Sequence, residues 1–221
     1  TPIKAAILTN ADIDHVAGLL SLRERSGLDV WSTATTAGFL RTNPMFSALA
    51  DDLVTWRDIA AGVAFSPLPG LEVVPFLAPG KVPLYAEEGV PETDVRSETT
   101  VGLELSAGGR RLVYLPSCAT IDEELLGHVR GADVLLFDGT VFRDDEMILA
   151  GVGEKTGRRM GHVPISGAGG SLSAFAQSGV GRRVYVHINN TNPILVEGSP
   201  ERAEVEAAGW EVAEDGMEIV P

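Results

Sequence analysis

Apolar and polar positions alternate along the chain in blocks that predict short strands and helices in turn. The apolar run from Ile3 to Leu8 is followed by the segment ADIDHVAGLLSLRER, in which valine and leucine recur at helical spacing. This pattern predicts a strand, then a loop that carries Asp12, Asp14 and His15, and then a helix. The first residues have the pattern of a strand inside a sheet, so we expect an N-terminal part to be missing.

The next segment continues the alternation of strands and helices. The residues from Leu28 to Ser32 form a strand-like run, and Thr33 is a residue type that caps a helix, which would extend through Leu40. Pro44 is typical of a helix start and opens a short helical piece that runs toward Asp51. Strands and helices in alternation are typical of the α/β class.

The middle of the chain predicts an antiparallel block. Strand-like runs occur at LEVVPFL, TTVGLEL and RRLVYL, and the sequence Ser-Ala-Gly-Gly between the last two suits a hairpin turn. A helix (IDEELLGHVR), a strand (ADVLLFD), a glycine-rich stretch from Gly139 to Gly170, a helix (SLSAFAQ) and a strand (RRVYVHI) follow. The glycine-rich stretch is much longer than an ordinary connection, which is typical of a functional loop.

Composition and charge narrow the class of protein. The chain has 221 residues, 44% of them hydrophobic, so we expect one domain over residues 1–221. Its 31 acidic residues against 17 lysines and arginines give a net charge of −14, which argues against nucleic acid and membranes as partners. The single cysteine, Cys118, cannot form an internal disulfide, and no segment resembles a signal peptide or a spanning helix. We therefore expect a cytoplasmic protein.

Polar side chains collect where the predicted strands end. Asp12, Asp14 and His15 follow the first strand, and His187 ends the strand RRVYVHI before a run of polar residues. Ligand sites of α/β sheets lie at such strand ends. An aspartate at a helix start also serves as a cap, and a strand-end histidine is often structural, so the residues alone leave both interpretations open.

Two further polar residues lie beside these candidates. Asp138 follows the apolar run VLLF and must stay solvated or find a partner, and His162 lies on the glycine-rich stretch. His128 belongs to an acidic helix and is expected at the surface. Cys118 is either a buried small residue or a nucleophile, and no neighbour in the sequence would lower its pKa.

The strand-end residues and the hairpin between two α/β halves resemble the metallo-β-lactamase fold. In that superfamily a first loop reads H-x-H-x-D-H, whereas this chain has Asn10 and Asp12 at the two leading positions. The residues that build the first metal site of the superfamily are thus replaced, while Asp14 and His15 of the second site are intact. Ser117 stands where the superfamily usually has a bridging aspartate.

The chain resembles the pyrroloquinoline quinone (PQQ) biosynthesis protein B family of that superfamily more closely. The shared strings are DHVAGLLSLRE, GVGEKTGRRMGHVPISGAGG, VHINNTNPIL and SPERAE. The resemblance implies a four-layer αβ/βα sandwich that lacks its N-terminal strands. It also implies a cytoplasmic enzyme that hydroxylates the tyrosine ring of a Glu-Tyr unit cut from a precursor peptide, with iron as cofactor and O₂ as cosubstrate.

Three residues are the predicted metal ligands: Asp14, His15 and His187. Two histidines and one carboxylate form the ligand set of mononuclear non-heme iron(II) oxygenases, and the replaced positions favour one metal over two. Zinc binds the same side chains and can substitute, so iron rests on the resemblance alone. Asp12 is predicted to be a fourth ligand or an orienting group.

The remaining site residues are predicted around this centre. We expect Asp138 and His162 on the rim of the pocket as catalytic residues, with His162 as a proton shuttle or a hydrogen-bond partner of the substrate. Asn189 and Asn190 are predicted to bind the substrate. The predicted partners are this small peptide-derived substrate and other PQQ biosynthesis proteins. The oligomeric state stays open, with a dimer as one alternative.

Two other functions remain alternatives to the hydroxylase. The first is a metal-dependent hydrolase, which the superfamily resemblance suggests but the replaced ligand positions weaken. The second is a carrier that transports PQQ or its precursor. Metal content and O₂ uptake with a Glu-Tyr compound would separate the three.

Overall fold

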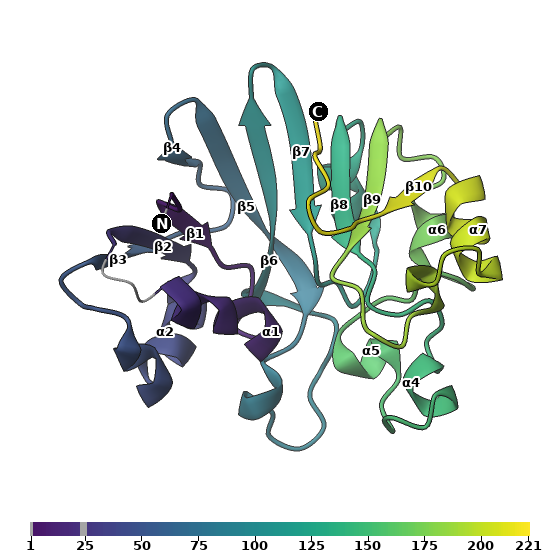
Figure 1. The fold of residues 1–221 in the computed structure, drawn as a ribbon, viewed down its shortest axis with the longest axis horizontal. Coiled ribbons are helices and arrows are strands. Elements are labelled where there is room, and N and C mark those ends of the chain that lie inside the picture. Colours follow the sequence, from purple (N-terminus) through teal and green to yellow (C-terminus); the bar gives the residue numbers. More distant parts are fainter. Residues whose placement is uncertain (1, 23–25) are drawn as a thin grey trace.

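The computed structural model describes residues 2–22 and 26–221 and contains two β-sheets (Figure 1). The smaller sheet has three parallel strands in the order β1-β2-β3. They are β1 (Ala5–Ile7), β2 (Leu28–Ser32) and β3 (Val54–Asp58). The end of the first predicted helix, Arg23 to Arg25, lies outside the described residues.

The larger sheet has seven strands in the order β10-β9-β8-β7-β6-β5-β4. Strands β4 to β7 pair antiparallel, and strands β7 to β10 pair parallel. Parallel strands end at the same edge of a sheet, so the residues after β8 and β9 are brought together. The strands are β4 (Phe65–Leu68), β5 (Leu71–Gly80), β6 (Val95–Ala107), β7 (Arg110–Leu115), β8 (Val134–Asp138), β9 (Arg182–Val186) and β10 (Trp210–Val212).

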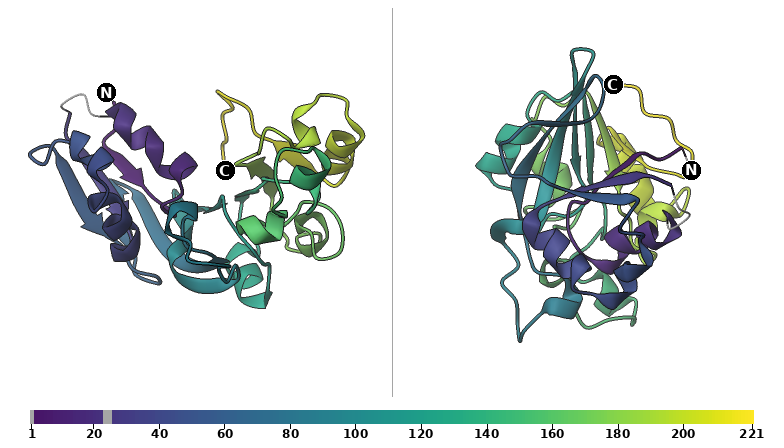
Figure 2. Two further views of the ribbon diagram at one scale, coloured as in Figure 1. Left: turned by 90° about the horizontal axis from the view of Figure 1, so that it is seen from below. Right: turned by 90° about the vertical axis from the view of Figure 1, so that its left-hand side faces the viewer.

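Most helices are short and lie on the outer sides of the sheets (Figures 1 and 2). The α-helices are α1 (Ile13–Val16), α2 (Ala34–Arg41), α3 (Glu123–Val129), α4 (Glu146–Leu149), α5 (Gly157–Met160), α6 (Ser171–Ala174) and α7 (Pro200–Ala207). Short 3-10 helices cover Ala17–Leu22, Pro44–Ala48, Leu84–Ala86 and Pro193–Leu195. None of the helices in the described part of the chain is long and apolar enough to cross a membrane.

Three apolar clusters hold the layers together. One joins the small sheet to its helices through residues such as Val30 and Leu40. A second lies between the sheets, where Ile7 packs against the cluster of Val73 and Leu103. The third and largest lies between the other face of the large sheet and its helices. The molecule is therefore the expected four-layer αβ/βα sandwich.

The two sheets are also tied by polar contacts at one end. The backbone N–H of Val101 in β6 donates to the carbonyl of Thr9, which follows β1, over 2.8 Å. The hydroxyl of Thr33, at the start of α2, donates to the carbonyl of Glu98 over 2.7 Å. Seen from below in Figure 2, the early and late parts of the chain form two arms, with β5 to β7 between them.

Several predicted elements differ from the structure. Asp14 and His15 do not lie on a loop but in α1, because the carbonyl of Asp12 accepts the N–H groups of His15 and Val16 and starts the helix early. The stretch from Gly139 to Gly170 is not one loop, since α4 and α5 form within it. Its glycines obscure the helical spacing. No element was predicted for the residues that form strands β3, β4 and β10 and helix α7.

Candidate metal centre

Three of the predicted ligands converge on one point between the two sheets. Nε2 of His187 lies 3.0 Å from Nε2 of His15 and 2.8 Å from Oδ2 of Asp14. His15 and His187 are partly buried, whereas the side chain of Asp14 is 65% exposed. His187 is 172 residues after His15 and 173 residues after Asp14 in the sequence. The predicted convergence of Asp14, His15 and His187 is what the structure contains.

The turn after β1 aims Asp14 and His15 at this point. The side chain of Asn10 accepts the backbone N–H of Asp12 over 3.0 Å, which fixes the turn before α1. The carboxylate of Asp12 accepts the N–H of Leu84 over 3.1 Å, so it ties α1 to the segment after β5. Because α1 begins at Ile13, the two ligands occupy successive positions of one helical turn.

His187 is held in an unusual backbone conformation directly after β9. It is the one residue other than glycine with a positive φ, 53°, in the described part of the chain. Such a conformation costs about 1–3 kcal/mol unless the surroundings favour it. Gly139 supplies part of that environment, since its N–H donates to the carbonyl of Val186 over 2.8 Å. A Cβ at Gly139 would lie 2.9 Å from Cβ of Tyr185, so no larger residue fits there.

The spacing of the three ligand atoms fits a single ion. Two atoms that are each about 2.1 Å from one ion lie about 3.0 Å apart in octahedral and about 3.4 Å apart in tetrahedral geometry. The separations of 2.8 and 3.0 Å therefore need little adjustment. Two imidazoles and one carboxylate also suit both zinc and iron. The residues present thus fit a metal ion.

Asp138, the last residue of β8, is a fully buried anchor of the site. Its Oδ2 accepts the backbone N–H of Cys118 over 3.0 Å and Nδ1 of His162 over 2.7 Å. Its Oδ1 accepts the N–H and the hydroxyl of Thr140 over 3.1 and 2.6 Å. Burial alone would raise the pKa of Asp138, but attraction to His162 and the hydrogen bonds outweigh it and hold the pKa well below its usual range.

Thr140 connects Asp138 to both histidines. Its hydroxyl gives its one hydrogen to Asp138, so its oxygen accepts Nδ1–H of His187 over 2.8 Å. This hydrogen bond fixes the ring of His187 with Nε2 toward Asp14 and His15, as an orienting partner of a metal ligand does. Asp138, His162 and His187 are also close enough to hold an ion. However, the hydroxyl of Thr140 lies 2.6–3.1 Å from ligand atoms of all three, so it occupies the space between them that an ion would need.

The protonation states of the two facing histidines differ. Burial, and then repulsion by His187, lower the pKa of His15 to about 4. Burial also disfavours the protonated ring of His187, but Asp138 and Asp14 outweigh it and raise the pKa to about 10. The hydrogen bond with His187 lowers the pKa of Asp14 to about 2. Without a metal, a proton on His187 therefore holds the three groups together, and a cation can take its place.

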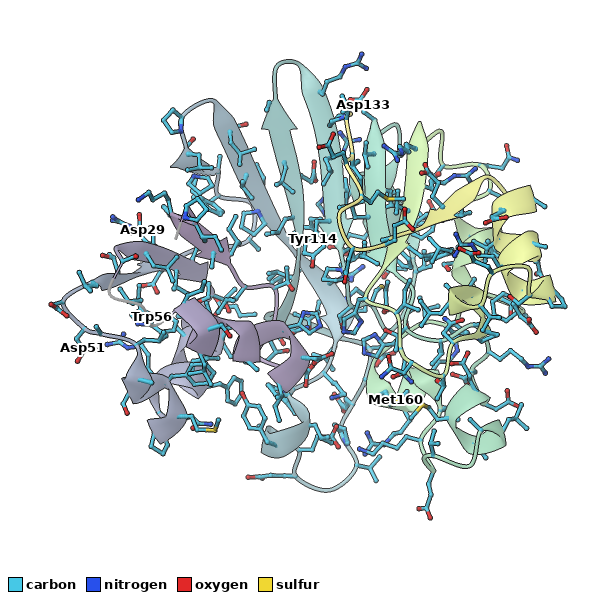
Figure 3. The ribbon with its side chains drawn as sticks, viewed as in Figure 1. Asp29, Asp51, Trp56, Tyr114, Asp133 and Met160 are labelled. Atoms are coloured by element: carbon cyan, nitrogen blue, oxygen red, sulfur yellow. The ribbon has the colours of Figure 1, made fainter. Side chains whose placement is uncertain are left out.

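A cavity of about 510 Å³ opens beside the three ligands, a volume typical of small-molecule sites. The predicted residues Asp12, His162, Asn189 and Asn190 all line it. The rings of His162 and His187 stack with centroids 5.2 Å apart, so His162 lies close to the centre as predicted. Met160, labelled in Figure 3, is another lining residue.

The structure places the remaining candidate side chains of the sequence analysis. Asp12 does not belong to either group of potential ligands found among the described residues, because its carboxylate is turned to Leu84. It is placed to orient the turn and not to bind the ion. Asn189 directs its amide to Met147 and Thr191, while Asn190 is exposed. Cys118 is buried, and burial raises the pKa of its thiol, which argues against a nucleophile.

Sequence reasoning missed Thr140, Lys81 and Lys155. Thr140 follows the strand-end Asp138 by two residues, and that spacing was the available signal. Lys81 follows β5 and Lys155 lies between α4 and α5, and both line the cavity. No pattern in the sequence places these two lysines beside the ligands.

Comparison with known proteins identifies a family of proteins with similar sequences. Residues 1–188 match the model of the beta-lactamase superfamily domain. The coenzyme PQQ synthesis protein B of Methylobacterium nodulans is 54% identical over 219 residues, which cover 99% of this chain and 73% of that protein. The protein of the same name from Rhizobium meliloti is 52% identical, with 99% and 72% covered.

A solved structure is similar over nearly the whole chain. The zinc-bound PqqB from Methylobacterium extorquens superposes with a TM-score of 0.95 and 52% sequence identity. The match covers 98% of this chain and 72% of that one.

Proposed function

This chain belongs to the coenzyme PQQ synthesis protein B family of the β-lactamase superfamily, and from that premise we propose that it acts in PQQ biosynthesis as an iron- and O₂-dependent hydroxylase. The proposed reaction converts one ring C–H bond of tyrosine, in a Glu-Tyr-derived precursor, into C–OH. One oxygen atom of O₂ enters the ring and the other leaves as water. The two electrons that this balance requires come from an external reductant.

The observation that carries the proposal is the convergence of Asp14, His15 and His187 beside a cavity of about 510 Å³. An iron(II) ion held by this ligand set would supply open positions for O₂ and the redox capacity that amino-acid side chains lack. Zinc fits the same ligands but has no redox chemistry.

The local geometry favours one ion over the pair that a hydrolase of this fold commonly uses. At the replaced positions, the side-chain oxygen of Asn10 accepts the backbone N–H of Asp12, and Oδ1 of Asp12 accepts the backbone N–H of Leu84. The second group of potential ligands encloses the hydroxyl of Thr140 and works as a hydrogen-bond network. A two-metal hydrolytic mechanism is therefore the weaker alternative.

The residues around the ligands have distinct proposed roles. Thr140 and Asp138 orient the His187 ring. His162 is assigned to proton transfer at the cavity wall, because Asp138 binds its Nδ1 and leaves Nε2 for exchange with a bound molecule. Asn189 and Asn190 are assigned to contacts with the polar part of the substrate. The predicted cytoplasmic location and the interaction with other PQQ biosynthesis proteins belong to the same proposal.

Reconstitution tests the proposal against its alternatives. Metal-free protein is loaded with iron(II) or with zinc and given a Glu-Tyr peptide, and O₂ uptake and peptide mass are followed. We expect O₂ uptake with iron only, matched by a product that gains one oxygen atom. Peptide cleavage with zinc and without O₂ would instead indicate a hydrolase, and binding without any conversion would indicate a carrier.

A further inference from the structure

The cavity beside the ligands has a cationic wall, although the chain as a whole carries a net charge of −14. Lys81 and Lys155 line the cavity together with Glu87. Their charges contrast with the acidic side chains Asp12 and Asp14, which line the same cavity. This contrast predicts that the lysines and the metal ligands recognise different chemical groups of one bound molecule.

Glu87 forms ion pairs with all the cations of this wall. Its Oε1 lies 3.1 Å from Nζ of Lys81, and its Oε2 lies 3.4 Å from Nζ of Lys155 and 3.2 Å from Nη2 of Arg159. The side chains of Lys81 and Glu87 are only 7% and 8% exposed. Burial opposes the ionisation of Glu87, but Arg159 and Lys81 outweigh it and lower its pKa to about 2.

One carboxylate does not balance these three cations. The cluster of Lys81, Lys155 and Arg159 around Glu87 has a formal surplus of two positive charges. Nη1 of Arg159 is buried and has no hydrogen-bond partner within the described residues. Partly buried charge without compensation is costly, so the cluster favours an additional anion.

The two lysines retain donors for such an anion. An ammonium has three N–H groups. Lys81 donates one to the carbonyl of Val82 over 3.1 Å, and its Nζ forms an ion pair with Oε1 of Glu87 at 3.1 Å. Lys155 directs one to Glu87 and is 40% exposed. The remaining N–H groups are enough for both oxygens of a carboxylate.

The lysines also lie at a suitable place relative to the ligands. The aliphatic part of Lys81 packs against Gly161, where a Cβ would lie 3.3 Å from Cγ of the lysine, and His162 is the next residue. Met147 and Met160 line the same cavity and add apolar surface. A molecule with an aromatic ring near the ligands and an anionic end at the lysines matches this division.

We propose that Lys81 and Lys155, positioned by Glu87 and Arg159, bind a carboxylate of the substrate and so determine its orientation in the cavity. The inference rests on the proposed function, because it assumes that the ring end of the substrate faces Asp14, His15 and His187. It adds that the enzyme selects substrates that carry a carboxylate remote from the ring.

Calorimetric titration of the iron-loaded protein under anaerobic conditions tests this without turnover. The two probes are Glu-Tyr and Gln-Tyr amide, which have the same shape but differ in their carboxylates. Lys155→Gln is expected to weaken Glu-Tyr binding about tenfold, or about 1.4 kcal/mol, and to change Gln-Tyr amide binding less than about twofold. Lys4→Gln is the matched control, because Lys4 is exposed and does not line the cavity. It should change neither.

Equal effects of Lys155→Gln on both probes, no effect on either, or no binding of Glu-Tyr to the unmodified protein would overturn the inference. Failure of the proposed function gives a different result. In that case the preference for Glu-Tyr still depends on Lys155, but O₂ uptake and hydroxylation do not occur. If hydroxylation occurs but Lys155→Gln affects both probes equally, the proposed function stands and only the carboxylate inference is refuted.

Discussion

Single side chains determine how the metal ligands are held, and Asp138 is the clearest case. It is fully buried, yet its two oxygens accept four hydrogen bonds, from Cys118, His162 and Thr140. Through Thr140 it also fixes the His187 ring. A carboxylate with this many donors acts as a support of the site, because a neutral group of the same shape cannot accept from all of them.

Asp138→Asn is therefore expected to weaken metal binding by about 10–100-fold, since the amide nitrogen opposes one of the donors and turns His162 or Thr140 away. The measurement is a competition titration with a metal-binding dye. Asp133→Asn is the matched control, because Asp133 lies just before the start of β8, at the opposite end of the strand from Asp138, and in Figure 3 it is well separated from the cavity residue Met160. An Asp138→Asn protein that is folded and binds metal within twofold of the original would contradict this role.

At the scale of elements, the connection after β8 packs directly against the connection after β9. Gly139 follows β8 and lies against Tyr185 and Val186 at the end of β9. Asp138 and His187 are neighbours of these residues, so the close approach of the two connections sets the position of both site residues. The lack of a side chain at Gly139 is what permits it.

Gly139→Ala tests this packing. The added Cβ would lie 2.9 Å from Cβ of Tyr185 and 3.0 Å from the carbonyl oxygen of Val186, so the backbone must shift. We expect a lower Tm and weaker metal binding together. Gly38→Ala in α2 meets no atom within 4 Å and should instead raise stability, by about 0.5–1 kcal/mol. Thermal unfolding of both variants checks the pair, and an unchanged Tm for Gly139→Ala would refute the argument.

Elements were predicted correctly where the apolar pattern and the cap residues of the local sequence are clear. Strand β2 and the start of α2 at Thr33 were predicted correctly, because apolar pattern and cap residue agree there. Asp14 and His15 were placed on a loop because the apolar residues at helical spacing begin only at Val16, after both of them. Strand β3 has exposed and half-buried positions and no apolar run, so its pairing with β2 is what makes it a strand.

At the scale of the whole molecule, the site exists because the two sheets pack together. Asp14 and His15 follow β1 of the small sheet, whereas Asp138 ends β8 and His187 follows β9 of the large sheet. His162 lies in the connection after α5. The sequence indicated the two aspartates, His15 and His187 as strand-end candidates and placed His162 on the glycine-rich stretch, but their convergence across 172 positions came from the family resemblance. The cationic wall was not predicted at all, because its residues are joined only by the tertiary fold.

The same wall predicts how the stability of the molecule depends on pH. The pKa of Glu87 is lowered from 4.5 to about 2 in the folded chain, so its stabilising contribution is complete above pH 4.5 and is lost as the pH falls toward 2. The difference in urea midpoint between the original protein and Glu87→Gln should be constant from pH 7 to 5. It should fall by about half near pH 3. A difference that stays unchanged at pH 3 would exclude this contribution.

The most direct test of the central claim, that Asp14, His15 and His187 hold one ion for hydroxylation, is the iron content and Glu-Tyr turnover of His187→Ala. His187 follows a strand and lies outside the apolar clusters, so the variant should fold with an unchanged circular dichroism spectrum. The account predicts that bound iron and hydroxylated product are both lost. A folded variant that keeps iron at full occupancy and converts Glu-Tyr at the original rate would contradict it.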